Sequence, residues 1–107
     1  MVKAIRMVET GGPEVLKLVD VEAQKPGAGE VLIEQKAIGL NFIDIYMRSG
    51  LYPVKLPFTP GSEGAGVVVE VGEGVQIFKP GDRIAYCGGS GGAYTEQRVM
   101  DAGKVVN

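Results

Sequence analysis

The stretch from Asn41 to Pro53, NFIDIYMRSGLYP, holds more chemically capable side chains than any other part of this 107-residue chain. They are one amide, one carboxylate, one guanidinium and two phenols, from Asn41, Asp44, Arg48, Tyr46 and Tyr52. Amides and phenols donate and accept hydrogen bonds, and arginine binds phosphates or carboxylates. The stretch therefore suits a ligand site. It equally suits a structural role in which Asn41 caps a helix and Arg48 pairs with Asp44 at i+4.

A second acidic position, Glu63, lies among glycines in the segment TPGSEGAG. Glycines on both sides of an acid indicate a backbone that passes close to a metal ion, a phosphate or a packed neighbour. The sequence has no histidine and a single cysteine, Cys87, so this chain cannot supply the ligands of a three- or four-coordinate zinc site. The residues alone favour a Glu63 that is held by a backbone turn or by an arginine.

The two other glycine-rich runs, VGEGV and CGGSGGAY, resemble phosphate-binding loops only in composition. A dinucleotide-binding loop follows a strand, opens a helix and has an acidic residue about twenty positions later. The run GGSGG leads instead into the alternating segment AYTEQRVM, which is typical of a strand. We therefore predict a hairpin turn there.

Short apolar or alternating segments separated by turn residues predict a mainly β fold. The predicted strands are residues 2–8, 15–22, 30–40, 64–72, 82–87 and 92–100, with a short last strand beginning at 104–106. Such a series indicates a β-barrel or sandwich. No long helices alternate with the strands, so the chain contains no doubly wound nucleotide-binding sheet.

The only predicted helix spans residues 41–50. Asn41 is the expected N-cap, Asp44 lies in the first turn, and Gly50 is the expected stop. The helical period places four residues on one face, namely Phe42, Ile45, Tyr46 and Ser49.

Composition narrows the class of protein. A net charge of -2, with no basic run, argues against a nucleic-acid partner. Hydrophobic residues make up 45% of the chain, enough for the core of a single domain. One cysteine excludes an internal disulfide framework and fits a reducing compartment. There is no apolar run of signal-peptide or membrane-spanning type, so we expect a cytoplasmic protein without a membrane partner.

Five motifs together resemble one family. GGPEVL, KAIGLNFIDIYMRSGLYP, PGSEGAGVVVEVGEGV, KPGDRIAY and GAYTE follow one another as in the zinc-independent quinone oxidoreductases, the zeta-crystallin-like branch of the medium-chain dehydrogenase/reductase superfamily. The resemblance runs from Met1 to Asn107. It implies an N-terminal GroES-like domain, a mainly β, twisted barrel with a few short helices.

The family's reaction is hydride transfer from NADPH to a quinone. By this resemblance the catalytic residues are Asn41, Tyr46 and Tyr52, with the two tyrosines as walls of the quinone cleft. The same resemblance implies cofactor-binding positions at Asn41, Phe42, Ile43, Asp44, Ile45 and Tyr46. In related zinc alcohol dehydrogenases, ligands occupy the places held here by Asn41 and Ser62. The resemblance therefore implies that no zinc is bound and that Glu63 orients a neighbour in the site.

The family's chains are longer and carry a nucleotide-binding domain that this sequence lacks. We therefore expect the 107-residue chain to lack most of the NADPH site, to be nearly inactive alone and to self-associate, most simply as a dimer. Two alternatives remain open. One is a domain of another zinc-independent reductase, such as an enoyl reductase. The other is a stand-alone GroES-like module for binding or assembly.

Overall fold

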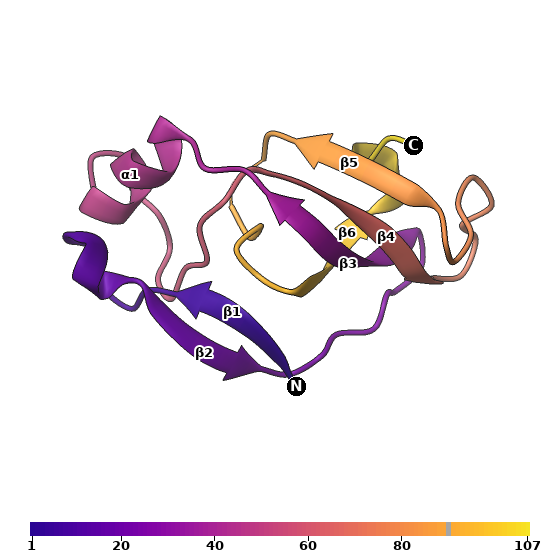
Figure 1. Cartoon of the computed structure of the whole chain (residues 1–107), viewed down its shortest axis with the longest axis horizontal. Helices are drawn as coiled ribbons and strands as arrows, with labels where there is room; N and C mark the ends of the chain where they lie inside the picture. The colour runs from indigo at the N-terminus through magenta and orange to yellow at the C-terminus, as the bar shows by residue number, and fades with distance from the viewer. Residues whose placement is uncertain (90) are drawn as a thin grey trace.

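The computed structural model describes residues 1–89 and 91–107, and consists of two antiparallel sheets and one α-helix (Figure 1). The smaller sheet pairs β1 (Val2–Arg6) with β2 (Lys17–Val21). The larger has the order β5-β4-β3-β6 and is built from β3 (Glu30–Ile38), β4 (Glu63–Val71), β5 (Arg83–Cys87) and β6 (Gln97–Asp101). The helix α1 (Phe42–Ser49) follows β3, and short 3₁₀ helices cover Pro13–Val15 and Ala102–Lys104.

Strand β3 organises the core because it is paired on both sides. Ile33, which is fully buried, lies opposite Val68 of β4 and opposite Arg98 of β6. The buried cluster around it consists of Val31, Ile33, Val68, Phe78, Ile84, Tyr86, Ala93, Ala102 and Val105. The apolar runs in the sequences of β3 and β4 are typical of central strands whose side chains are buried.

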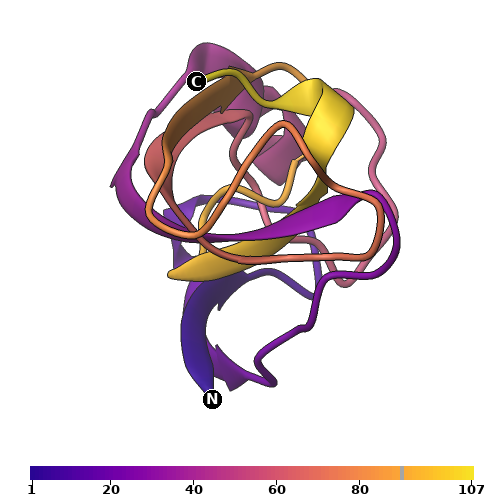
Figure 2. The same ribbon diagram turned by 90° about the vertical axis from the view of Figure 1, so that its right-hand side faces the viewer.

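The β1–β2 hairpin is attached to the larger sheet through irregular segments. Ile5 N donates to Tyr94 O at 2.8 Å, and Met7 N donates to Phe58 O at 2.9 Å. In the end-on view of Figure 2 this hairpin lies at the side of the molecule opposite the C-terminus. Tyr94 therefore sits where the hairpin, the larger sheet and the segment before β4 meet.

The prediction of a mainly β fold with one helix is confirmed, and the bounds of several strands differ from those predicted. The predicted strand 92–100 begins only at Gln97, because Ala93 N and Tyr94 N donate to Gly61 O and Pro60 O instead of joining a ladder. The last predicted strand was wrong at Lys104, which lies in a 3₁₀ helix. Only an isolated bridge between Ala85 and Val106 follows it.

The predicted second strand starts at Lys17 rather than at residue 15, because Pro13 opens a 3₁₀ helix that includes Val15. The predicted GGSGG turn includes Ser90, which lies outside the described residues. Its glycines at 88, 89, 91 and 92 all have positive φ, which fits a turn. Within the described part of the chain, no helix has the length and hydropathy needed to cross a bilayer.

Candidate functional site

Helix α1 begins and ends where the sequence predicts. Asn41 is extended (φ −132°, ψ 157°), and its N–H donates to Asp44 Oδ2 at 3.0 Å. Gly50 has φ +91°, a left-handed conformation that favours glycine and stops the helix. Arg48 holds the last turn in place, since its Nε donates to Gly11 O at 3.2 Å. Within residues 1–89 and 91–107 the i+4 pairing of Arg48 with Asp44 is not found, so that interpretation was wrong.

The apolar face of α1 points away from the protein core. Phe42 is 76% exposed, and Ile45 and Tyr46 are also exposed, as is Ser49. The predicted shared face is therefore an outer face. The buried position of this helix is Asp44, which is 4% exposed. A helix that exposes its apolar side and buries a carboxylate presents a surface suited to a ligand or another protein segment.

The two predicted cleft tyrosines lie together at the end of this helix. The Tyr46 and Tyr52 ring centroids are 5.4 Å apart with an interplanar angle of 63°, an edge-to-face pair. Tyr52 N donates to Tyr46 O at 3.1 Å, which fixes the chain after the helix against its last turn. Tyr46 and Tyr52 are 37% and 47% exposed, so part of each residue is accessible to a ligand.

Glu63 lies against the start of the helix. Asn41 Nδ2 donates to Glu63 Oε2 at 3.2 Å. The carboxylate also covers Gly39, where a Cβ would overlap its atoms. The Glu63 side chain thus packs against the backbone at Gly39 and is hydrogen-bonded by Asn41. Of the expectations from the residues, a packed neighbour is what the structure shows, and the partner is an amide rather than an arginine.

The buried carboxylate of Asp44 contacts the partly buried side chain of Tyr94. Tyr94 Oη donates to Asp44 Oδ2 at 2.6 Å. Burial and this hydrogen bond to the carboxylate raise the pKa of the Tyr94 phenol above its ordinary value. The residues from the sequence analysis did not include Tyr94 or Gly39 as parts of the site. Their only signals were that Tyr94 belongs to the motif GAYTE and that Gly39 belongs to the motif KAIGLNFIDIYMRSGLYP.

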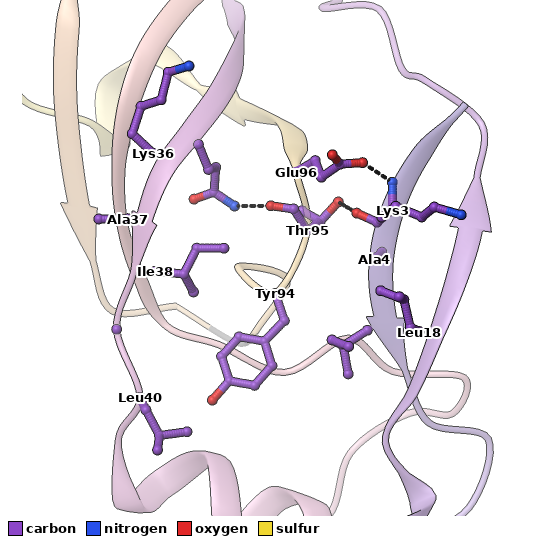
Figure 3. Close-up of a pocket in the computed structure, with 13 residues that line it drawn as sticks. Lys3, Ala4, Leu18, Lys36, Ala37, Ile38, Leu40, Tyr94, Thr95 and Glu96 are labelled. Atoms are coloured by element: carbon purple, nitrogen blue, oxygen red, sulfur yellow. Dashed lines mark hydrogen bonds between the residues drawn. The ribbon is translucent and has the colours of Figure 1, made fainter.

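An apolar groove of 420 Å³ borders the site and lies between β1, β2 and the end of β3 (Figure 3). Leu18, Ile38 and Leu40 line it, and the Tyr94 side chain extends along it toward the helix. The groove leads to Leu40, which directly precedes Asn41. No group of three or more His, Cys, Asp or Glu side chains in the described residues is arranged to hold a metal ion.

Residues 27–107 match the alcohol dehydrogenase GroES-like domain family. The chain belongs to this family. The GroES-like fold expected from the resemblance is thereby confirmed. The matched residues include strands β3 to β6 and helix α1.

Three relatives of this GroES-like domain are quinone oxidoreductases. The quinone oxidoreductase of Pseudomonas aeruginosa is 52% identical over 108 residues, covering 100% of this chain and 33% of its own length. The crystal structure of the Pseudomonas syringae pv. tomato quinone oxidoreductase has a TM-score of 0.93 at 53% identity, covering 99% of this chain and 33% of that one. The Escherichia coli quinone oxidoreductase complexed with NADPH also has a TM-score of 0.93, at 45% identity, covering 97% of this chain and 32% of that one. The chain spans about a third of the length of the relatives it matches.

Proposed function

We propose that this chain is the substrate-side domain of a zinc-independent, NADPH-dependent quinone reductase. The relatives support this proposal, because they are quinone oxidoreductases and one is complexed with NADPH. The other domain in this proposal is a nucleotide-binding domain that completes the enzyme. A single exposed cysteine, Cys87, fits a protein of the reducing cytoplasm.

The observation that carries the proposal is the outer face of α1 with the tyrosine pair at its end. Flat quinone and nicotinamide rings need apolar surface on which to lie and a few polar groups that fix their direction. Phe42 and Ile45 supply exposed apolar surface, and the pair of Tyr46 and Tyr52 supplies aromatic edges with accessible hydroxyls. This combination suits ring stacking beside hydrogen-bond donors.

In the proposed assignment the catalytic residues are Asn41, Tyr46 and Tyr52. Tyr46 and Tyr52 form the quinone wall, and Asn41 bonds a quinone oxygen or the nicotinamide ribose. Positions along the first turns of α1 border the cofactor, namely Asn41, Phe42, Ile43, Asp44, Ile45 and Tyr46. The Asp44 side chain faces inward, so its contribution is to the position of the helix. Glu63 holds the Asn41 amide in one direction by the hydrogen bond at 3.2 Å.

The chemistry requires no covalent bond between substrate and protein. NADPH supplies a hydride, and a quinone that accepts it takes up a proton to become the hydroquinone. The contribution of this chain is to hold the quinone ring at a fixed distance from the nicotinamide ring and to stabilise the negative charge that develops on the quinone oxygen. Tyr52 is 47% exposed, and in this proposal its hydroxyl donates to that oxygen.

The proposal includes the absence of catalytic zinc. Asn41 and Ser62 hold the places at which the zinc enzymes of the superfamily have ligands. The Asn41 amide donates to Glu63, and neither an amide nor a hydroxyl is among the Cys, His, Asp and Glu side chains that usually bind zinc. Charge on the substrate oxygen is then stabilised by hydrogen-bond donors of the protein.

The test is a chimera in which this chain replaces the matching N-terminal residues of the Pseudomonas aeruginosa quinone oxidoreductase. We expect the chimera to oxidise NADPH when a quinone is added. The isolated 107-residue chain should not do so. Reduction of a conjugated enone without reduction of any quinone would contradict the proposal and favour the enoyl reductase alternative. The intact relative serves as the positive control.

A further inference from the structure

The Asp44 carboxylate accepts two hydrogen bonds, both at one of its oxygens. Oδ2 accepts from Asn41 N at 3.0 Å and from Tyr94 Oη at 2.6 Å. Oδ1 is buried and has no hydrogen-bond partner among the described residues. An unpaired oxygen of a buried carboxylate is unfavourable. Oδ2 closes the capping box of α1, whereas the buried Oδ1 has no hydrogen bond within the described residues to offset its burial.

Tyr94, the partner of Asp44, is fixed in place by its backbone. Tyr94 N donates to Pro60 O at 2.9 Å, and Tyr94 O accepts from Ile5 N at 2.8 Å. Its ring packs directly against Gly61, where a Cβ would come 2.5 Å from Tyr94 Cδ1. Gly61 also has φ +106°, so two constraints require glycine beside this ring.

These contacts place one side chain between the two elements that meet in the site. The Tyr94 hydroxyl holds the first turn of α1, which begins at Asn41, and the Tyr94 ring holds the segment that leads from Gly61 to Glu63. The Asn41–Glu63 hydrogen bond joins these same two elements. Tyr94 therefore contacts both elements, in addition to the pairing of Ile38 with Gly64 and the bond from Gly39 N to Glu63 O at 3.3 Å, which also hold them together.

We propose that Asp44 and Tyr94 are positioning residues, which act together to direct the Asn41 amide toward Glu63. The inference concerns the geometry of Asn41, and its catalytic meaning rests on the proposed function. Neither residue needs to touch a substrate. A test of this role must therefore measure the environment of the Asn41 side chain itself, separately from the stability of the domain.

The experiment uses the ¹⁵N-labelled chain and follows the side-chain amide resonances of Asn41 by NMR. In Tyr94→Phe we expect these resonances to shift and their hydrogen exchange to accelerate about threefold to tenfold, the change that loss of one hydrogen bond gives. Tyr86→Phe is the matched control. It removes a tyrosine hydroxyl that donates to Gln35 and, among the described residues, has no hydrogen bond to Asp44, Asn41 or Glu63, so it should leave the Asn41 resonances in place.

Asp44 is tested by two substitutions. Asp44→Asn keeps one oxygen that can accept both hydrogen bonds, so it should preserve the Asn41 resonances. Asp44→Ala should shift them as Tyr94→Phe does, and if this variant does not fold, Tyr94→Phe decides alone. Unchanged Asn41 resonances in Tyr94→Phe, or an equal shift in Tyr86→Phe, would overturn the proposal. Because the readout does not use turnover, an inactive chimera would refute the proposed function and leave this inference standing.

Discussion

Asn41 donates its side-chain amide to Glu63, with 3.2 Å between Nδ2 and Oε2. This bond joins the start of α1 to the first residue of β4. It gives the acid within the glycine-rich segment a defined partner. Because Gly39 has no side chain, the carboxylate can lie over the backbone at the end of β3 and still reach the amide.

The Asn41–Glu63 bond should appear as an energetic coupling. We expect Asn41→Ala to lower the free energy of unfolding by about 1 kcal/mol, since a hydrogen bond of this kind contributes about 0.5–1.5 kcal/mol. Urea unfolding of Asn41→Ala, Glu63→Ala and the double variant measures the coupling. If the two single effects simply add, the side chains do not interact in solution. The same unfolding data show how much of any loss of turnover in Asn41→Ala comes from lower stability rather than from a lost contact with a ligand.

Tyr52→Phe in the chimera should reduce quinone turnover more than it changes NADPH affinity. The substitution keeps the ring that packs edge-to-face on Tyr46 and removes only the hydroxyl. If that hydroxyl acts in the transition state, the rate should fall by up to about tenfold. Steady-state kinetics with a quinone, together with an NADPH titration, separates the two effects. Weaker NADPH binding at an unchanged rate would instead place Tyr52 at the cofactor.

The raised pKa of Tyr94 predicts a loss of stability at alkaline pH. Burial and the Asp44 carboxylate favour the neutral phenol in the folded state. The stabilisation is therefore complete below the unfolded pKa of about 10 and is lost as pH rises toward the higher folded pKa. We expect the urea midpoint to fall as the pH rises above about 10, and to fall less in Tyr94→Phe.

The comparison with Tyr94→Phe is needed because a second group acts in the same direction. The hydrogen bond and charge of Asp20 raise the pKa of Lys3, so its contribution is also lost at high pH. Lys3 is present in both variants, and the difference between their pH profiles isolates Tyr94. Identical profiles would show that the Tyr94 phenol is not in the environment described.

Local patterns in the sequence were sufficient to locate the strands and the helix. Apolar runs identify β3 and β4, and Asn41 and Gly50 mark the ends of α1 because caps and stops are local features. The bounds failed where backbone groups bond to distant segments. Tyr94 alternates like a strand residue, yet its N–H bonds Pro60 O, which periodicity cannot reveal.

The candidate site was predictable in part for the same reason. Asn41, Tyr46 and Tyr52 lie within one stretch, so their proximity follows from the chain itself. The contacts of Asp44 with Tyr94 and of Asn41 with Glu63 join residues 50 and 22 positions apart, and only the fold brings them together. The outward direction of the apolar helical face was likewise undetermined, because helical period gives a shared face but not the side on which the core lies.

Zinc should not bind stoichiometrically to this chain. The sequence contains no histidine and one cysteine, and the Glu63 carboxylate already accepts from Asn41. Elemental analysis of protein dialysed against zinc-containing and then chelator-free buffer is the measurement. Retention of one tightly held zinc per chain would contradict the proposed zinc-independent chemistry.

The end of β3 is expected to drive self-association of the isolated chain. β3 pairs with β4 as far as Ile38, but on its other side the ladder with β6 covers Glu30–Glu34, followed by one bond from Gln35 N to Glu96 O at 2.9 Å. The edge beyond therefore leaves backbone groups available along the groove of 420 Å³, which exposed Leu18 and Leu40 also line. Open edges beside apolar surface recruit other strands, and a second copy offers the same edge, so a two-fold dimer is the simplest product.

Light scattering over a wide range of protein concentration tests this association, with and without NADPH. We expect the apparent mass to rise with concentration and to be insensitive to NADPH, because the one connection from a strand to an α-helix among the described residues, from β3 to α1, lacks the G-x-G-x-x-G turn that binds pyrophosphate. Ile38→Lys places a charge on the open edge and should restore the monomer. Val8→Lys, at an apolar position that is 71% exposed elsewhere on the surface, is the matched control and should still associate. A wild-type chain that stays monomeric at every concentration would show that this edge and groove do not recruit a second copy.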